Sequence, residues 1–227
     1  MWGKGRYIVQ KFFDTREELD AEVEKLVAND FDAYFGCAKF GDANNREHEN
    51  AEYFHALWMD VDCGEEKAKK AEGYIDQETG LKAVMEFCRT QKLPRPIIVD
   101  SGNGLHFYWI LTEVVRRPEW EVLAKRFCAL ALEKGLIVDT SVFEASRVLR
   151  IPGTFNFKNS PPSPVTVISE EHDVTDYAVW KALIDAPDVE PPEDTSHLPR
   201  GMSPLQEALM ENRIKRFSTI MIKSAEG

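Results

Sequence analysis

The pattern of apolar and polar positions along the chain predicts a mixture of strands and helices. Segments rich in β-branched and aromatic residues predict strands at 6–13, 31–40, 55–62, 96–100, 105–111, 136–139 and 164–169. Helical spacing of apolar residues predicts helices at 15–29, 78–92, 118–134 and 175–184. Thr15 and Glu18 form a capping box for the first helix, and Gly135 ends the third. Because strands and helices do not alternate regularly, we expect an α+β fold.

The acidic, proline-rich stretch "DAPDVEPPEDTSHLPRGMSP" divides the chain into two parts. We expect a catalytic domain at residues 1–186, a linker at 187–202 and the start of a C-terminal helical region at 203–227. The helix prediction for this tail follows from the spacing of Leu205, Leu209, Ile214, Phe217, Ile220 and Met221. Since the chain stops soon after that apolar stripe, we expect it to be part of a longer protein.

The segment "HALWMDVDCG", residues 55–64, places two carboxylates on one face of a predicted strand. Strand side chains alternate, so Asp60 and Asp62 face the same way, opposite to Leu57, Met59 and Val61. Two carboxylates side by side on a half-buried surface repel each other and lose hydration. A bound divalent metal would relieve this cost. The alternative is a strand that ends in a solvated turn.

The segment "RPIIVDSGNGLHFYWIL" predicts a hairpin whose glycine-rich turn spans residues 101–104. Such a turn exposes amide N–H groups. Ser101, Asn103, Gly104 and His106 could therefore bind phosphate oxygens through hydroxyl, backbone and imidazole groups. The alternative is an ordinary hairpin that carries a half-exposed histidine.

The segment "GLIVDTSVFEASRVLRIPGTFNFK" supplies a third carboxylate and three cations. Asp139 closes a short apolar run as Asp60 does, so it could reach the same metal. Arg147 and Arg150, in a segment predicted to be irregular, and Lys158 suit phosphate binding. The alternative is surface ion pairing with neighbouring acids such as Glu144.

Composition and charge narrow the range of functions. With 227 residues and 43% hydrophobic content, the chain can bury a substantial core. A net charge of −11 argues against indiscriminate nucleic-acid binding, although it leaves room for a local basic groove. No apolar stretch approaches the roughly 20 residues of a membrane span, and no signal-peptide layout is present. We therefore expect the protein to be located in the cytoplasm of a bacterial or phage-infected host cell. The four cysteines are scattered singly, which predicts no zinc site.

The order "WMDVD", "SGNGLHFYW", and "LIVD" followed by "RVLRIPGTFNFK" resembles the three motifs of the archaeo-eukaryotic primase superfamily. The similarity is closest to primase-polymerases of phages, plasmids and related mobile elements, and it covers about residues 31–158. The resemblance implies an RNA-recognition-like antiparallel sheet with an additional α/β unit on its N-terminal side, often followed by a helical domain. Ser101 stands further from His106 than the family's Ser-x-His element would place it.

The resemblance also implies roles for the candidate residues. It assigns a pair of metal ions, Mg²⁺ or Mn²⁺, to the carboxylates and the incoming triphosphate to the histidine, and it directs the basic residues to nucleotide or template phosphates. The carboxylates are those of Asp60, Asp62 and Asp139, and the histidine is His106. The basic residues are Arg147, Arg150 and Lys158.

The function these features predict is that of a template-dependent nucleotidyltransferase, a DNA primase-polymerase that uses two-metal phosphoryl transfer. The expected partners are a single-stranded or primed DNA template, nucleoside triphosphates of either sugar type, and a helicase or a helical domain of the same longer protein, with no membrane. One alternative is a metal-dependent nuclease or phosphodiesterase that directs the same carboxylates at water. Another is a non-catalytic replication-initiator domain that binds single strands through sheet aromatics such as Phe107 and Tyr108.

Overall fold

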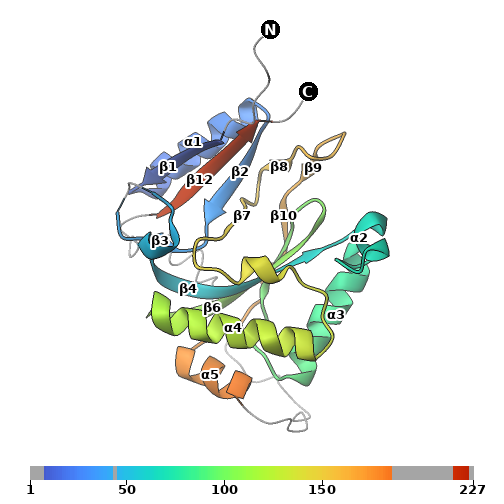
Figure 1. Ribbon diagram of the computed structural model, residues 1–227. Coiled ribbons are helices and arrows are strands. Elements are labelled where there is room, and N and C mark those ends of the chain that lie inside the picture. Colours follow the sequence, from blue (N-terminus) through green and yellow to red (C-terminus); the bar gives the residue numbers. More distant parts are fainter. Residues whose placement is uncertain (1–7, 43–44, 186–216, 225–227) are drawn as a thin grey trace.

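The computed structural model describes residues 8–42, 45–185 and 217–224, the last of these as backbone only. Two sheets organise the chain, a smaller one at the top of Figure 1 and a larger one that crosses the middle of the molecule below it. The first sheet is antiparallel and four-stranded, in the order β1 (Ile8–Phe13), β12 (Phe217–Ser224), β2 (Phe31–Gly36) and β7 (Val148–Arg150). Helix α1 (Arg16–Ala28) covers it, and the Thr15 hydroxyl caps that helix by accepting from the Glu18 N–H, as the capping box predicts.

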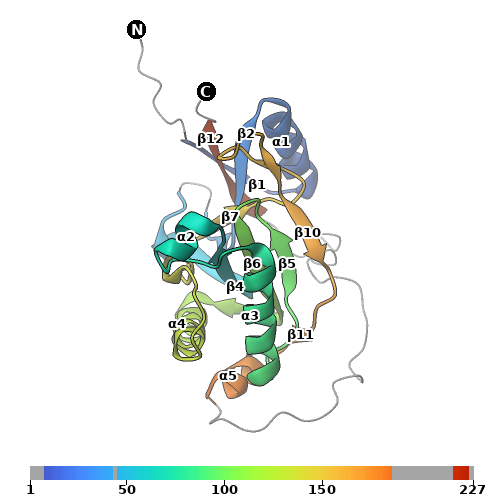
Figure 2. The same cartoon turned by 90° about the vertical axis from the view of Figure 1, so that its right-hand side faces the viewer.

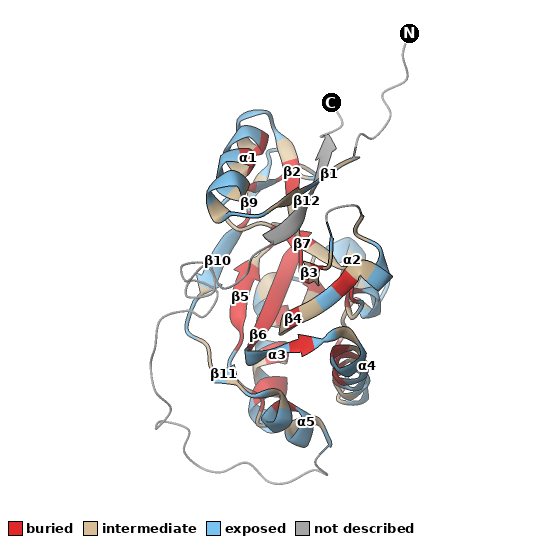
Figure 3. Ribbon diagram, turned by 90° about the vertical axis from the view of Figure 1, so that its left-hand side faces the viewer, coloured by how far each residue is buried: buried red, intermediate tan, exposed pale blue. Residues whose placement is uncertain are grey.

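The second sheet is six-stranded and carries most of the core. Its order is β10 (Thr166–Ser169), β5 (Ile97–Asp100), β6 (Gly104–Arg116), β4 (Ala51–Asp62) and β3 (Lys39–Phe40), with β11 (Val174–Thr175) parallel to β6. A separate ribbon pairs β8 (Phe155–Asn156) with β9 (Ser163–Pro164). In Figure 3 the buried residues concentrate on β4, β5 and β6.

Helices α3 (Gln77–Thr90), α4 (Arg117–Glu133) and α5 (Tyr177–Asp185) flank the second sheet (Figure 2). Four tryptophans fill the space between strands and helices. Trp58 of β4 stacks on Trp120 of α4 with ring centroids 4.5 Å apart, and Trp109 of β6 meets Trp180 of α5 edge-on. Burial of such large rings removes much apolar surface from water. The core therefore holds β4 and β6, which carry the candidate site, as a rigid pair.

The predicted α+β class is confirmed, as are most of the predicted elements. Residues 136–139 are an exception, because they form no strand and instead lead into a short 3₁₀ helix, η2 (Thr140–Val142), capped by Asp139. Residues 148–150 were predicted to be irregular but form β7, which pairs with β2. Helix α2 (Glu65–Lys69) was not anticipated. Within the described ranges, no helix is long and apolar enough to cross a membrane.

The prediction of a helical tail is wrong where the structure describes the tail. Residues 217–224 form β12, which lies between β1 and β2 and pairs with both in antiparallel fashion. The run "FSTIMIKS" contains Thr219, Ile220 and Ile222, and β-branched residues favour strands when neighbouring strands are available. The predicted linker at 187–202 and residues 203–216 lie outside the described ranges. Because β12 belongs to the same sheet as β1 and β2, residues 217–224 are part of the N-terminal sheet although they follow the boundary predicted at residue 186.

We expect the end of the chain to contribute to stability, since β12 is the strand that joins β1 to β2. A chain ending at residue 190 should unfold at a temperature at least about 5 °C below that of the full chain, because both strands lose a pairing partner. A chain ending at residue 224 keeps β12 and serves as the control. Equal midpoints for all three chains in thermal unfolding would contradict the placement of β12.

Candidate active site

The register of β4 and β6 brings two of the predicted site residues together. Asp60 pairs with His106 across the two strands, and Asp62 pairs with Gly104. Val61 faces α3, since its Cγ1 would lie 3.2 Å from a Cβ built on Gly80 of that helix. Asp60, Asp62 and His106 therefore point to the opposite face. The Asp60 Oδ1 and His106 Nε2 atoms are 3.9 Å apart.

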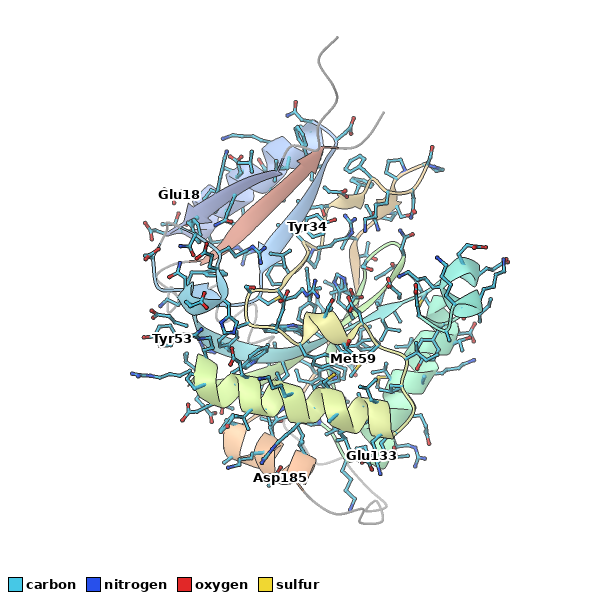
Figure 4. All side chains as sticks on the ribbon, viewed as in Figure 1. Glu18, Tyr34, Tyr53, Met59, Glu133 and Asp185 are labelled. Atoms are coloured by element: carbon cyan, nitrogen blue, oxygen red, sulfur yellow. The ribbon has the colours of Figure 1, made fainter. Side chains whose placement is uncertain are left out.

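This face of the second sheet is turned toward the β2–β7 end of the first. Phe35 of β2 contacts Tyr108 of β6 with ring centroids 6.0 Å apart, and the Cys37 N–H donates to the Arg147 carbonyl at 2.9 Å. In Figure 4 the labelled Tyr34 of β2 and Met59 of β4 mark the two sheets between which the site lies. The candidate residues thus occupy the junction of the two sheets.

The third predicted carboxylate, Asp139, is held beside Asp60. The Asp139 N–H donates to the Asp60 carbonyl at 3.2 Å. The Asp139 carboxylate caps η2 by accepting from the N–H and the hydroxyl of Ser141, at 2.9 and 2.7 Å. The Trp58 indole N–H donates to the Val142 carbonyl at 2.6 Å and fixes η2 against β4. The structure therefore brings together the three aspartates that the sequence selects.

The electrostatics of Asp60 reflect this crowding. Burial first, and then the negative charges of Asp62 and Asp139, raise the pKa of its carboxyl from an ordinary 3.8 to about 7. The cationic Arg147 and Lys158 oppose the shift. The Asp60 side chain is only 22% exposed, so water cannot fully stabilise its charge. The binding of a further cation, in addition to Arg147 and Lys158, would therefore stabilise the charged form of Asp60.

Two cationic side chains already contact the aspartates. The Lys67 Nζ lies 2.7 Å from Asp62 Oδ2, and an Arg147 guanidinium nitrogen lies 3.8 Å from Asp139 Oδ2. Carboxylate oxygens are the ligand type that Mg²⁺ and Mn²⁺ prefer. Even so, within the described ranges no three His, Cys, Asp or Glu side chains are grouped so that they could hold one ion. The donor atoms suit a divalent metal, whereas their present arrangement pairs them with lysine and arginine.

His106 is buried, not half-exposed, and this changes its chemistry. Burial, together with the positive charges of Arg150 and Arg147, lowers its pKa to about 3, so the imidazole is neutral at pH 7. Its Nδ1 lies 3.3 Å from the Tyr108 hydroxyl, whose own pKa burial raises well above its ordinary value. A hydroxyl that stays protonated can donate to Nδ1, which leaves the proton of the imidazole on Nε2. His106 would then offer a phosphate an N–H donor and no charge.

The glycine-rich turn is clamped by two asparagines, Asn156 and Asn159, to which the sequence analysis assigns no role. Asn159 donates from Nδ2 to the Gly102 carbonyl at 3.2 Å and to Asn103 Oδ1 at 2.6 Å. Asn156 of β8 donates to the Ser101 carbonyl at 2.9 Å. These amides lie in the run that contains Lys158, so the clamp also places Lys158 near the turn. Asn156 lies within the run "RVLRIPGTFNFK" that carries the family resemblance, whereas no sequence pattern distinguishes Asn159 from an ordinary loop residue.

Part of the predicted phosphate cradle is already used by the protein. The Ser101 N–H donates to the Gly104 carbonyl at 3.0 Å, and the Gly102 N–H donates to Asp100 Oδ1 at 2.7 Å. These two amides are not exposed to a ligand, contrary to the prediction for this turn. A glycine is required at position 104 for a separate structural reason, since a Cβ there would lie 2.3 Å from the Val61 carbonyl oxygen. The Ser101 side chain is buried.

The two predicted arginines have different positions. Arg147 stays at the site, where it donates to the Ser141 hydroxyl at 2.6 Å and lies 3.8 Å from Glu144. Arg150 is buried on β7, where it pairs with the buried Asp32 of β2 and lies 4.8 Å from the Tyr34 ring. Arg150 therefore links two strands of the first sheet and is not an exposed phosphate ligand. The partner Asp32 is 118 positions away in the sequence, which explains why spacing did not reveal the pair.

The burial of Phe107 and Tyr108 does not favour the alternative in which these two rings bind single strands. Phe107 is fully buried, with its ring centroid 6.2 Å from that of Trp109 in the core. Tyr108 is buried beneath Phe35. Neither ring can stack on a base without unfolding part of the sheet.

Asp60→Asn should stabilise the metal-free protein in a pH-dependent way. A carboxyl whose pKa is raised on folding binds its proton more tightly in the folded state, so wild-type stability falls as pH rises from about 4 to about 7. The variant has no such loss. Its advantage should grow from near zero at pH 4 to as much as about 4 kcal/mol at pH 8. Thermal unfolding in EDTA would measure it, with Asp30→Asn, at an exposed position where asparagine tolerates the positive φ, as the control. A pH-independent difference would contradict the account.

Arg150→Met should destabilise the protein by about 3–5 kcal/mol, because Asp32 is left buried without its partner. Adding Asp32→Asn should recover part of this loss, since an amide oxygen can still accept from the Phe157 N–H while no charge stays buried. Urea unfolding measures both. If Arg150→Met kept wild-type stability but lost nucleotide binding, Arg150 would return to the phosphate role that the sequence predicted.

Comparison with known proteins gives one relative and one structural neighbour. No family model matches the sequence. A replication protein of Clostridium perfringens is 26% identical over 142 residues, which are 61% of this chain. The chain spans about a third of that protein's length, 32%.

A solved structure, the AEP domain of the primase-polymerase of cyanophage S-2L, superposes with a TM-score of 0.53. The match covers 78% of this chain and 88% of that domain, at 20% sequence identity. The resemblance that the motifs indicated is thereby supported by the three-dimensional structure. The chain has the α+β fold of the archaeo-eukaryotic primase domain.

Proposed function

We propose that the protein is a template-dependent nucleotidyltransferase, a DNA primase-polymerase. The observation that carries the proposal is the placement of Asp60 opposite His106 across β4 and β6, with Asp139 hydrogen-bonded to the Asp60 backbone. These residues come from three separate segments of the sequence, and the fold gathers them at one junction between the sheets. Three carboxylates beside a neutral imidazole and two cations suit a substrate that is both metal-bound and highly anionic.

The side chains divide the work of binding such a substrate. Asp60, Asp62 and Asp139 would hold divalent cations, Mg²⁺ or Mn²⁺, which supply charge stabilisation for the attacking hydroxyl and the leaving pyrophosphate. His106 would donate its Nε2 proton to a phosphate oxygen. Arg147 and Lys158, whose charges act on Asp60, would neutralise further phosphate charge.

The comparisons support this proposal through the names of similar proteins. One is a replication protein and the other the AEP domain of a primase-polymerase. We propose single-stranded or primed DNA and nucleoside triphosphates as the partners of this chain. The net charge of −11 means that binding must rely on local groups such as Arg147 and Lys158. A helicase partner remains an expectation from the sequence resemblance.

A metal-dependent nuclease could use the same three carboxylates to activate water. It would have less need of a buried imidazole and two cations placed to bind several phosphates. The two functions differ in their products on one substrate: a polymerase lengthens a primer, whereas a nuclease shortens the template.

We expect Asp60→Asn to reduce primer extension by at least about a thousand-fold, because it removes a metal-ligand charge. Since the same substitution should stabilise the fold at neutral pH, the loss cannot be attributed to unfolding. The assay combines a labelled primer on a template, or an unprimed template, with deoxy- or ribonucleotides and Mn²⁺, and Asp30→Asn is the control. Extension by the variant at the wild-type rate would exclude Asp60 from catalysis, and template shortening by the wild type would favour the nuclease.

A further inference from the structure

The segment between β4 and α3 is anchored beside Asp62 at both of its ends. The Gly64 N–H donates to the Tyr74 carbonyl at 2.8 Å, and the Tyr74 N–H donates to the Asp62 carbonyl at 2.9 Å. A Cβ at Gly73 would lie 2.3 Å from that same carbonyl oxygen, so the close approach requires glycine. Residues 64–74 thus leave the strand at Asp62 and return to it, with α2 between.

The same segment is also tied to the chain that carries Asp139. The Ile137 N–H donates to the Tyr74 hydroxyl at 3.1 Å, two residues before Asp139. The position of α2 is therefore set relative to two of the three aspartates. This helix presents Lys67 to the site.

Lys67 forms an ion pair with one of the metal-ligand candidates. Its Nζ lies 2.7 Å from Asp62 Oδ2 and 3.7 Å from Glu72 Oε2. Both Lys67 and Asp62 are partly exposed, at 43% and 32%, and ion pairs of this kind add little to stability. The stability of the fold therefore gives little reason for the Lys67–Asp62 pair.

We propose that Lys67 exchanges partners during substrate binding: it neutralises Asp62 in the metal-free site and moves to the substrate phosphates when a divalent cation takes Asp62. This inference rests on the proposed function. An ammonium group and a divalent cation repel each other at one carboxylate, so the arrival of the metal releases Lys67. The flexible lysine stem allows the move without a change in α2. The triphosphate that accompanies the metal then provides the nearest strong negative charge.

The exchange has two opposite consequences for binding. Lys67 weakens the binding of a metal ion that arrives alone, because it competes for Asp62. It strengthens the binding of a nucleotide that arrives with the metal, because it gains phosphate contacts. Metal and nucleotide therefore bind cooperatively, and Asp62 keeps a cationic partner when both are absent.

The test compares Lys67→Met with Lys70→Met, a neighbouring exposed lysine that serves as the matched control. Mn²⁺ is titrated into the full chain without nucleotide, and free Mn²⁺ is followed by electron paramagnetic resonance. Lys67→Met should bind Mn²⁺ up to about five-fold more tightly than wild type. In saturating Mn²⁺ it should bind a non-hydrolysable nucleoside triphosphate at least about ten-fold more weakly. Lys70→Met should match wild type in both titrations.

The outcomes separate this inference from the proposed function. If wild type and Lys67→Met bind Mn²⁺ equally, or bind the nucleotide equally, the exchange is overturned while the polymerase proposal stands. If the wild-type chain binds no Mn²⁺ and extends no primer, the proposed function fails and the exchange fails with it. Because Lys67 is half-exposed, the variant should fold normally, which an unchanged thermal midpoint would confirm.

Discussion

The antiparallel register of β4 and β6 is the constraint on which the candidate site depends. It sets Asp60 opposite His106 and Asp62 opposite Gly104. A slip of one residue would turn every side chain of one strand to the other face and send the carboxylates toward α3. Gly104 helps to fix the register, because only a residue without a side chain fits so close to the Val61 carbonyl. The stacking of Trp58 on Trp120 adds packing that a shifted register would lose.

The cost of this register is an excess of negative charge at the junction of the two sheets. Asp60 responds with a pKa raised to about 7 through burial and its acidic neighbours. Lys67 and Arg147 respond by pairing with Asp62 and Asp139. In the function that we propose, the arrangement that is unfavourable in the empty site becomes favourable when metal ions and phosphates bind. Stability and substrate binding are therefore opposed at Asp60, which is common where charged groups are concentrated for function.

The sequence predicted the parts of this site that depend on local periodicity. The two-residue alternation around Asp60 and Asp62 correctly placed both on one face, and the hairpin after Ser101 correctly brought His106 to the neighbouring strand. Features that depend on distant partners could not be read in this way. The Asp32–Arg150 pair joins residues far apart in sequence, and it holds Arg150 buried within the first sheet. The Asn159 clamp and the placement of Lys67 likewise depend on how segments fold back on one another.

The tail illustrates how tertiary context decides between two local preferences. Residues 217–224 fit both a helical stripe and a β-branched strand, and the open position between β1 and β2 selects the strand. A propensity argument without the partner strands could not have chosen between them.

The central claim is that β4 and β6 together hold a metal-bound nucleotide at the junction of the sheets. The most direct measurement is anomalous diffraction from crystals grown with Mn²⁺ and a non-hydrolysable nucleoside triphosphate. The account predicts manganese peaks among the carboxylates of Asp60, Asp62 and Asp139, with a phosphate oxygen within hydrogen-bond distance of His106 Nε2. Manganese bound elsewhere, or a triphosphate away from His106, would contradict it.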